Sequence, residues 1–97
     1  MGSLAYGYAS EIEIDDRTLA HLQIVLLSRL RRHESCSLSW NVAAPGAGRE
    51  TIWISDAIPL RFRYDPEQAG PVNRAWIDEL NLAASRGELR ITPEPGT

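Results

Sequence analysis

Residues 11–33, EIEIDDRTLAHLQIVLLSRLRRH, decide the fold, because a strand pattern changes there into a helix pattern. Residues 11–15 alternate charged and apolar side chains, and this period of two places one set on one face of a sheet. Leucines then recur every three or four positions, which predicts an amphipathic helix over 16–33. Asp15 or Asp16 suits the start of that helix, and the basic residues at its end suit the negative end of the helix dipole. A strand followed directly by a core helix is therefore expected.

Further strand patterns lie on both sides of this segment. Residues 4–8 alternate large and small side chains and predict a first strand, with a turn at 9–10. Residues 36–42 and 51–55 alternate polar and apolar side chains on either side of Pro-Gly-Ala-Gly, which predicts a β-hairpin. Residues 60–64 alternate again and stop at Asp-Pro, which predicts another strand.

A second helix and a last strand are predicted in the remaining part of the chain. Pro71 suits the first turn of a helix that ends near Arg86, just before a glycine. The predicted inward stripe of this helix is Val72, Trp76, Leu80 and Ala83. Residues 89–91 predict a strand, and residues 92–97 are expected to form a frayed tail.

The resulting order, β-β-α-β-β-β-α-β, predicts an α+β fold with a largely antiparallel sheet and two helices mainly on one face. The length of 97 residues and the hydrophobic fraction of 43% suit one globular domain over residues 1–97. A single hydrophobic core is expected.

Several features predict a cytoplasmic chain with no membrane partner. No apolar run approaches the ~20 residues that span a bilayer. The first residues lack the basic and apolar regions of a signal peptide. The one cysteine, Cys36, has no partner for an internal disulfide and lies in a strand pattern, so it is expected to be a small buried thiol.

The charge composition restricts the chemistry. The net charge is −3, so binding to nucleic acid would need a local basic patch. All ten basic residues are arginine, and the absence of lysine closes every mechanism that uses a lysine amine in this chain.

No set of residues predicts a catalytic or metal site. Gly46-Ala47-Gly48 lies between two strands and reads as a hairpin loop instead of a phosphate-binding loop. His21 and His33 are twelve positions apart and lack the spacing of a metal-binding pair. No catalytic residue and no cofactor is predicted, and the balance favours a protein that is not an enzyme.

The strand periodicities divide the side chains into two faces. The predicted inward set is Ile12, Ile14, Leu38, Trp40, Ile52, Ile54, Leu60, Phe62, Leu89 and Ile91. The predicted outward set is Glu11, Glu13, Ser37, Ser39, Asn41, Thr51, Trp53, Arg61, Arg63 and Arg90.

Trp53, Arg61, Arg63 and Arg90 form the predicted binding patch, because an indole and three guanidinium groups leave the core together. Aromatic and arginine side chains on a sheet can stack bases and hold phosphates, and they suit an acidic protein partner equally well. The alternative is a polar open face with cross-strand pairs between arginine and glutamate. Single-stranded nucleic acid and a protein partner therefore both remain open.

Five segments carry a resemblance to a known family: IEIDDRTLAHLQIV (12–25), SLSW (37–40), TIWISDAIPLRFRY (51–64), NRAWIDEL (73–80) and GELRITPEP (87–95). The chain resembles a family of small stand-alone bacterial domains of unknown function. Members of that family often carry the automatic label "ATP-dependent DNA ligase". Such ligases use the lysine of a Lys-x-Asp-Gly motif as nucleophile, and this chain has neither lysine nor Asp-Gly.

The sequence thus favours a noncatalytic binding or interaction module that contacts its partner through an open sheet face or an edge strand. The alternative is a function related or accessory to an ATP-dependent DNA ligase, as the label of the resembled family implies.

Overall fold

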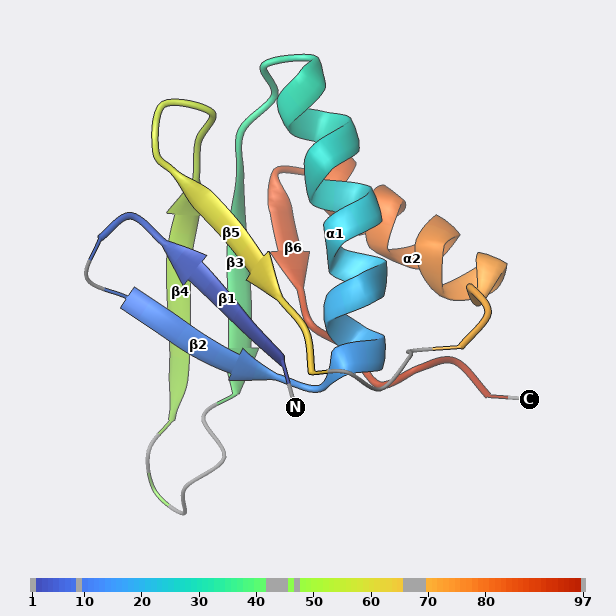
Figure 1. The fold of residues 1–97 in the computed structure, drawn as a ribbon. Coiled ribbons are helices and arrows are strands. Elements are labelled where there is room, and N and C mark those ends of the chain that lie inside the picture. Colours follow the sequence, from blue (N-terminus) through green and yellow to red (C-terminus); the bar gives the residue numbers. More distant parts are fainter. Residues whose placement is uncertain (1, 9, 42–45, 47, 66–69, 97) are drawn as a thin grey trace.

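In the described part of the chain, residues 2–8, 10–41, 46, 48–65 and 70–96, the computed structural model has six strands and two helices in the predicted order (Figure 1). The elements are β1 (Gly2–Tyr6), β2 (Ser10–Ile14), α1 (Asp16–Arg31), β3 (Cys36–Asn41), β4 (Arg49–Ile54), β5 (Leu60–Arg63), α2 (Arg74–Ser85) and β6 (Glu88–Arg90). The predicted α+β class is confirmed. Some residues that the sequence assigned to turns, a strand end, loops and the tail lie outside the described part of the chain: 9, 42–45, 47, 66–69 and 97.

The strands form two sheets of three strands each, in the orders β2-β1-β5 and β4-β3-β6. We call these the first and the second sheet. Among the strands of the described residues, three of the four pairings are antiparallel and the pairing of β3 with β6 is parallel. The first sheet lies in front of the second in Figure 1, and the two helices lie beside each other along one side of the sheets. The division into two sheets was not foreseen, because β4 and β5 follow each other in sequence but pair with strands of different sheets.

One hydrophobic core joins the two sheets and the two helices. Leu4 and Ile14 come from the first sheet, and the second sheet contributes Leu38, Ile54 and Leu89. The buried faces of the helices consist of Leu19, Leu22, Val25 and Leu26 on α1 and Trp76, Ile77, Leu80 and Ala84 on α2. All ten residues of the predicted inward set are buried in this core or packed against it. The period of two therefore located the inner faces of β2 to β6, whereas the inward set contained no residue of β1.

Cys36 is buried at the start of β3, as predicted. Burial raises the pKa of its thiol, and the charge of Arg29 opposes this effect. A thiol in such a setting is less ionised than a free one and behaves as a small core residue.

The ends of the helices differ from the prediction. α1 begins with Asp15 as cap and ends at Arg31 instead of residue 33, because His33 has a φ of +57° and its N–H donates back to the carbonyl of Leu30. α2 begins after Asn73, whose side chain accepts from the N–H of Trp76, and not at Pro71.

The predictions for Val72 and Ser39 are wrong. The first error comes from the start of α2, and the second comes from the position of a strand in its sheet. Val72 is 53% exposed because α2 begins after it. Ile77 and Ala84 are buried although the stripe did not include them, whereas Ala83 packs against the core as predicted. Ser39 was predicted outward but is only 1% exposed, because it is a short side chain on the central strand and its hydroxyl bonds to that of Thr51 at 2.8 Å.

The first strand also begins earlier than predicted, at Gly2 instead of residue 4, and its turn includes Gly7 and Tyr8. The N–H of Gly7 donates to the carbonyl of Pro59 at 2.8 Å, so this turn lies beside the segment that leads into β5. Tyr8 is 97% exposed at that end of the first sheet.

Candidate binding site

The outer face of the first sheet has small side chains along its central strand and charged side chains on both edge strands. Ala5 is in register with Glu11 on β2 and with Arg61 on β5. Ser3 is in register with Glu13 and Arg63 in the same way. Residues in register share a face of the sheet, so these side chains project to the same side. We define the trough as Ser3, Ala5, Gly7, Glu11, Glu13, Arg61 and Arg63.

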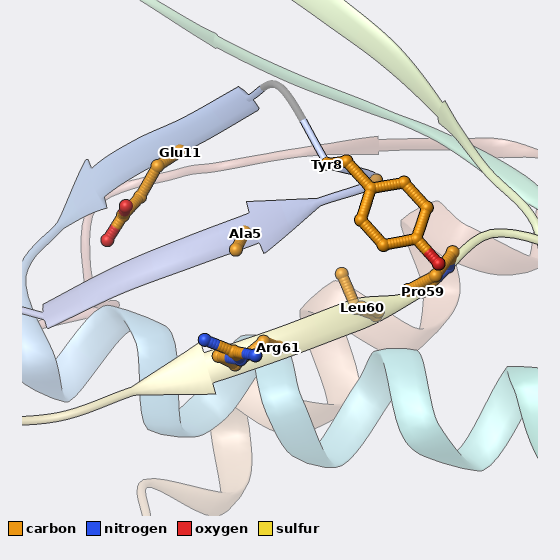
Figure 2. A pocket seen from close by; sticks show the side chains of 7 residues that line it. Ala5, Tyr8, Glu11, Pro59, Leu60 and Arg61 are labelled. Carbon is orange, nitrogen blue, oxygen red and sulfur yellow. The ribbon is translucent and has the colours of Figure 1, made fainter.

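The trough has an acidic wall and a basic wall. Figure 2 shows Glu11 and Arg61 on opposite sides of the short Ala5 side chain, with Tyr8 and Pro59 at one end. Two hollows lie along it, of about 460 Å³ and 540 Å³, and both are bordered by Glu11. The larger hollow is also bordered by Asp65, an acidic residue just beyond the basic wall. Volumes of this size fall within the range of ligand sites in proteins.

In the described part of the chain, most charged side chains of the two walls form no ion pair with another residue. Glu11 accepts a hydrogen bond of 2.7 Å from the Ser3 hydroxyl. Within the described ranges, the structure has no ion pair for Glu13, Arg61 or Arg63. All three are exposed, so their charges are available to a partner.

The four residues of the predicted patch are all exposed, but they belong to two sheets. Arg61 and Arg63 lie together on the basic wall of the trough. Trp53, which is 59% exposed, lies on β4 of the second sheet, and Arg90 lies on β6 at the other edge of that sheet. Through their register with Ser37 and Ser39 of β3, Trp53 and Arg90 project from the same outer face of the second sheet.

Sequence reasoning did not identify the trough itself. The one sequence feature related to the trough was the alternation of large and small side chains around Ala5. This alternation predicted a strand, but it did not show which strands would pair with that strand. Glu11 and Glu13 were placed on the outer face, yet nothing in the sequence showed that β1 separates them from Arg61 and Arg63.

The trough contains carboxylates, guanidinium groups and a hydroxyl, which are groups that bind ions and hydrogen-bond partners. Among the described residues, no group of three or more histidine, cysteine, aspartate and glutamate side chains is arranged to hold a metal ion. Neither helix in the described ranges has the length and apolar character needed to cross a membrane.

A family model whose description is "Domain of unknown function (DUF7882)" matches residues 1–94 of the chain. No curated protein and no solved structure matches it. The predicted resemblance to a family of domains of unknown function is thereby confirmed. The description names no activity and no source, so a relation to ATP-dependent DNA ligases and a bacterial origin stay predictions.

Proposed function

This chain belongs to the DUF7882 family of domains of unknown function, and we propose that it is a noncatalytic module that binds a protein partner in the trough. The observation that carries the proposal is the pair of oppositely charged walls, Glu11 and Glu13 against Arg61 and Arg63, on either side of a floor of small residues. A partner with both acidic and basic side chains complements both walls.

The same charges favour a protein over a nucleic acid in the trough. The two walls are separated by one strand, hence by about 10 Å, which is well within the screening length of about 30 Å at about 0.01 M salt and slightly beyond the length of about 8 Å at physiological salt. At low salt, where phosphate contacts are strongest, a phosphate held by Arg61 or Arg63 would therefore be repelled by Glu11 and Glu13. A polypeptide can satisfy both walls, and each exposed charge pair that it forms adds specificity more than affinity.

A peptide-display selection tests this proposal. Random peptides are selected against the wild-type chain and then measured against Arg61→Glu/Arg63→Glu. We expect selected peptides to carry both charge signs and to lose at least about tenfold in affinity for the variant, as like charges are brought together. The control is Arg31→Glu/Arg74→Glu, which makes the same change in net charge at two exposed helix positions.

Two results would contradict the proposal. One is the selection of no peptide at all. The other is a set of peptides that bind the wild type and Arg61→Glu/Arg63→Glu equally well.

Trp53 supports a second candidate, the binding of single-stranded nucleic acid on the outer face of the second sheet. An indole that is 59% exposed can stack on a base, and Arg90 on the same face can contact a phosphate. The net charge of −3 and Glu88 beside Arg90 on β6 oppose this binding, so we expect it to be weak and to have a shallow salt dependence.

Single-stranded DNA titrations at low salt, followed by tryptophan quenching, test this second candidate. If DNA binds the second sheet, Arg90→Glu should reduce the quenching and Arg61→Glu/Arg63→Glu should not. Negligible quenching in all three proteins would reject nucleic-acid binding.

A ligase-related or accessory role is the remaining alternative from the sequence. Adenylation of a lysine needs the amine that this chain lacks, so labelled ATP with Mg²⁺ should leave no covalent label on the protein in denaturing electrophoresis. A stable adenylated band would support the ligase-related role and would contradict a noncatalytic module.

A further inference from the structure

We propose that the partner in the trough is the same face of a second copy of this chain, so that the protein forms a symmetric dimer. This inference rests on the proposed function of the trough as a protein-binding surface. It adds the identity of the partner and the symmetry of the complex.

The arrangement of charges on the first sheet is self-complementary. Consider a two-fold axis that runs parallel to β1, midway between two copies packed face to face. This axis places β2 of one copy opposite β5 of the other and leaves positions along the strands unchanged. Glu11 then faces Arg61 of the second copy, and Glu13 faces Arg63 of the second copy, because each glutamate shares a row with its arginine. The two-fold repeats both pairs, as an isologous interface requires.

The remaining residues of the face fit the same packing. Packed sheets lie about 10 Å apart, and the short side chains of Ser3 and Ala5 leave the middle of the face open to such an approach. Tyr8 and Pro59 both border the hollow at one end of the trough, on the β1–β2 turn and at the start of β5. The axis brings Tyr8 of one copy towards Pro59 of the other, which adds an apolar contact to the charged ones.

The size of the face sets the expected strength. Three strands of four or five residues cover a face of about 15 Å by 15 Å, well below the ~800 Å² that each partner buries in a standard interface. We therefore expect a weak dimer, with a dissociation constant in the micromolar range. Because its charge pairs lie at the edges of the face, added salt should weaken it.

A charge-swap experiment tests the inference on the full chain. Analytical ultracentrifugation at low salt, from about 1 to about 300 µM, covers the dissociation constants expected of a weak dimer. The acidic variant is Arg61→Glu/Arg63→Glu, and the basic variant is Glu11→Arg/Glu13→Arg. We expect each variant alone to dimerise at least about tenfold more weakly than the wild type, since like charges face each other. An equimolar mixture of the two should restore a dimer, because every wall then meets the opposite charge.

Two controls keep the experiment decisive. Arg31→Glu/Arg74→Glu should dimerise like the wild type, since both positions lie on helices outside the trough. Glu11 bonds to Ser3, so if the basic variant fails to fold, Glu13→Arg alone replaces it in the mixture.

Every outcome bears on the inference. A wild type that stays monomeric at all concentrations overturns it, as does a dimer that neither charge variant weakens or a mixture that does not reassociate. If the wild type is monomeric but the selected peptides still bind the trough, the proposed function stands and only the second copy is rejected. If the peptides also fail, both are rejected.

Discussion

Gly2 occupies a position that has no room for a side chain. A Cβ atom there would lie 2.5 Å from Oδ1 of Asp16 and 2.6 Å from the backbone carbonyl oxygen of Arg63. Gly2 is therefore the point at which the first strand, the start of α1 and the end of β5 meet. Sequence patterns did not identify this role, because a glycine next to the initial methionine has no periodicity of its own.

We expect Gly2→Ala to destabilise the fold by about 1–3 kcal/mol, as overpacking of a close contact does. Urea unfolding at neutral pH measures the change. Gly96→Ala is the matched control, since a Cβ atom there would meet nothing within 4 Å. Equal midpoints for the two variants would mean that the start of β1 moves away from Asp16 at little cost.

His21 is a buried residue whose two ring nitrogens both have backbone partners. Nδ1 lies 2.7 Å from the carbonyl oxygen of Arg17, and Nε2 accepts from the N–H of Asn73 at 2.9 Å. Because a carbonyl only accepts, Nδ1 donates to Arg17 and Nε2 serves as the acceptor for Asn73. The ring also contacts Trp76, with centroids 4.6 Å apart. His21 thus connects α1 to the cap of α2 and has a structural role.

His21→Phe keeps an aromatic ring beside Trp76 but leaves the N–H of Asn73 without its acceptor. We expect a loss of about 1–3 kcal/mol in the free energy of unfolding, the cost of an unsatisfied buried donor. The control is His33→Asn, at an exposed histidine whose positive φ asparagine tolerates, and its change should stay within about 0.5 kcal/mol. A loss in His21→Phe as small as in this control would show that water replaces the imidazole as acceptor.

The segment after β6 is attached to both helices through Glu94. The guanidinium of Arg17 donates to its two carboxylate oxygens at 2.6 and 2.8 Å, and the amide of Asn73 donates at 2.8 Å. The same Arg17 donates to the carbonyl of Pro71, just before α2. The sequence predicted a frayed tail over 92–97, and nothing in the letters TPEPGT indicated a partner 77 positions earlier.

Glu94 makes stability depend on pH in the acid range. The hydrogen bonds from Arg17, and then from Asn73, lower the pKa of Glu94 from 4.5 to about 2. A carboxyl group whose pKa is lower in the folded chain stabilises the fold above its unfolded pKa and loses that effect as pH falls through the folded pKa. The stabilisation is therefore complete above about pH 4.5 and disappears towards pH 2.

Glu94→Gln should accordingly have a lower urea midpoint than the wild type at pH 7, and the difference should shrink between pH 4.5 and 2. Urea titrations in steps across this range measure it. A difference that stays constant down to pH 2 would mean that the bond to Arg17 does not depend on the charge of Glu94.

The two sheets are joined near one end by the hydroxyl of Tyr6. It donates to the carbonyl of Trp53 and accepts from the N–H of Ser55 at 3.2 Å, so a residue of β1 is bonded to the end of β4 and to the residue after it. This bond connects the sheet that carries the trough to the sheet that carries Trp53 and Arg90.

Tyr6→Phe should lower the free energy of unfolding by about 0.5–1.5 kcal/mol, the net contribution of a typical hydrogen bond, because water can reach the exposed carbonyl that the hydroxyl leaves. Urea unfolding measures this, and hydrogen exchange at Ser55 should show faster opening. Tyr8→Phe, at a side chain that is 97% exposed, is the matched control and should behave like the wild type. Unchanged exchange at Ser55 in Tyr6→Phe would show that the sheets hold together without this bond.

Local patterns were enough to predict the order of the strands and helices, the inward set and the buried thiol of Cys36. Each of these follows from a repeat in hydrophobicity within a single strand or helix, because a period of 2 or 3.6 identifies both the type of element and its buried face. The errors within elements, at Val72 and at the end of α1, came from caps and from one positive φ, which shift a boundary by a few residues.

Pairing between strands that are distant in the sequence determined the two sheets and the trough. Alternation shows that β4 and β5 are strands but not that they join different sheets, so it could not show that Trp53 and Arg90 lie apart from Arg61 and Arg63. Ser3 and Ala5 become the floor of a trough only because β1 pairs with strands on both of its edges. Many pairings satisfy the same alternation, and the choice among them depends on how both sheets and both helices fill one core, which is a property of the whole packed chain.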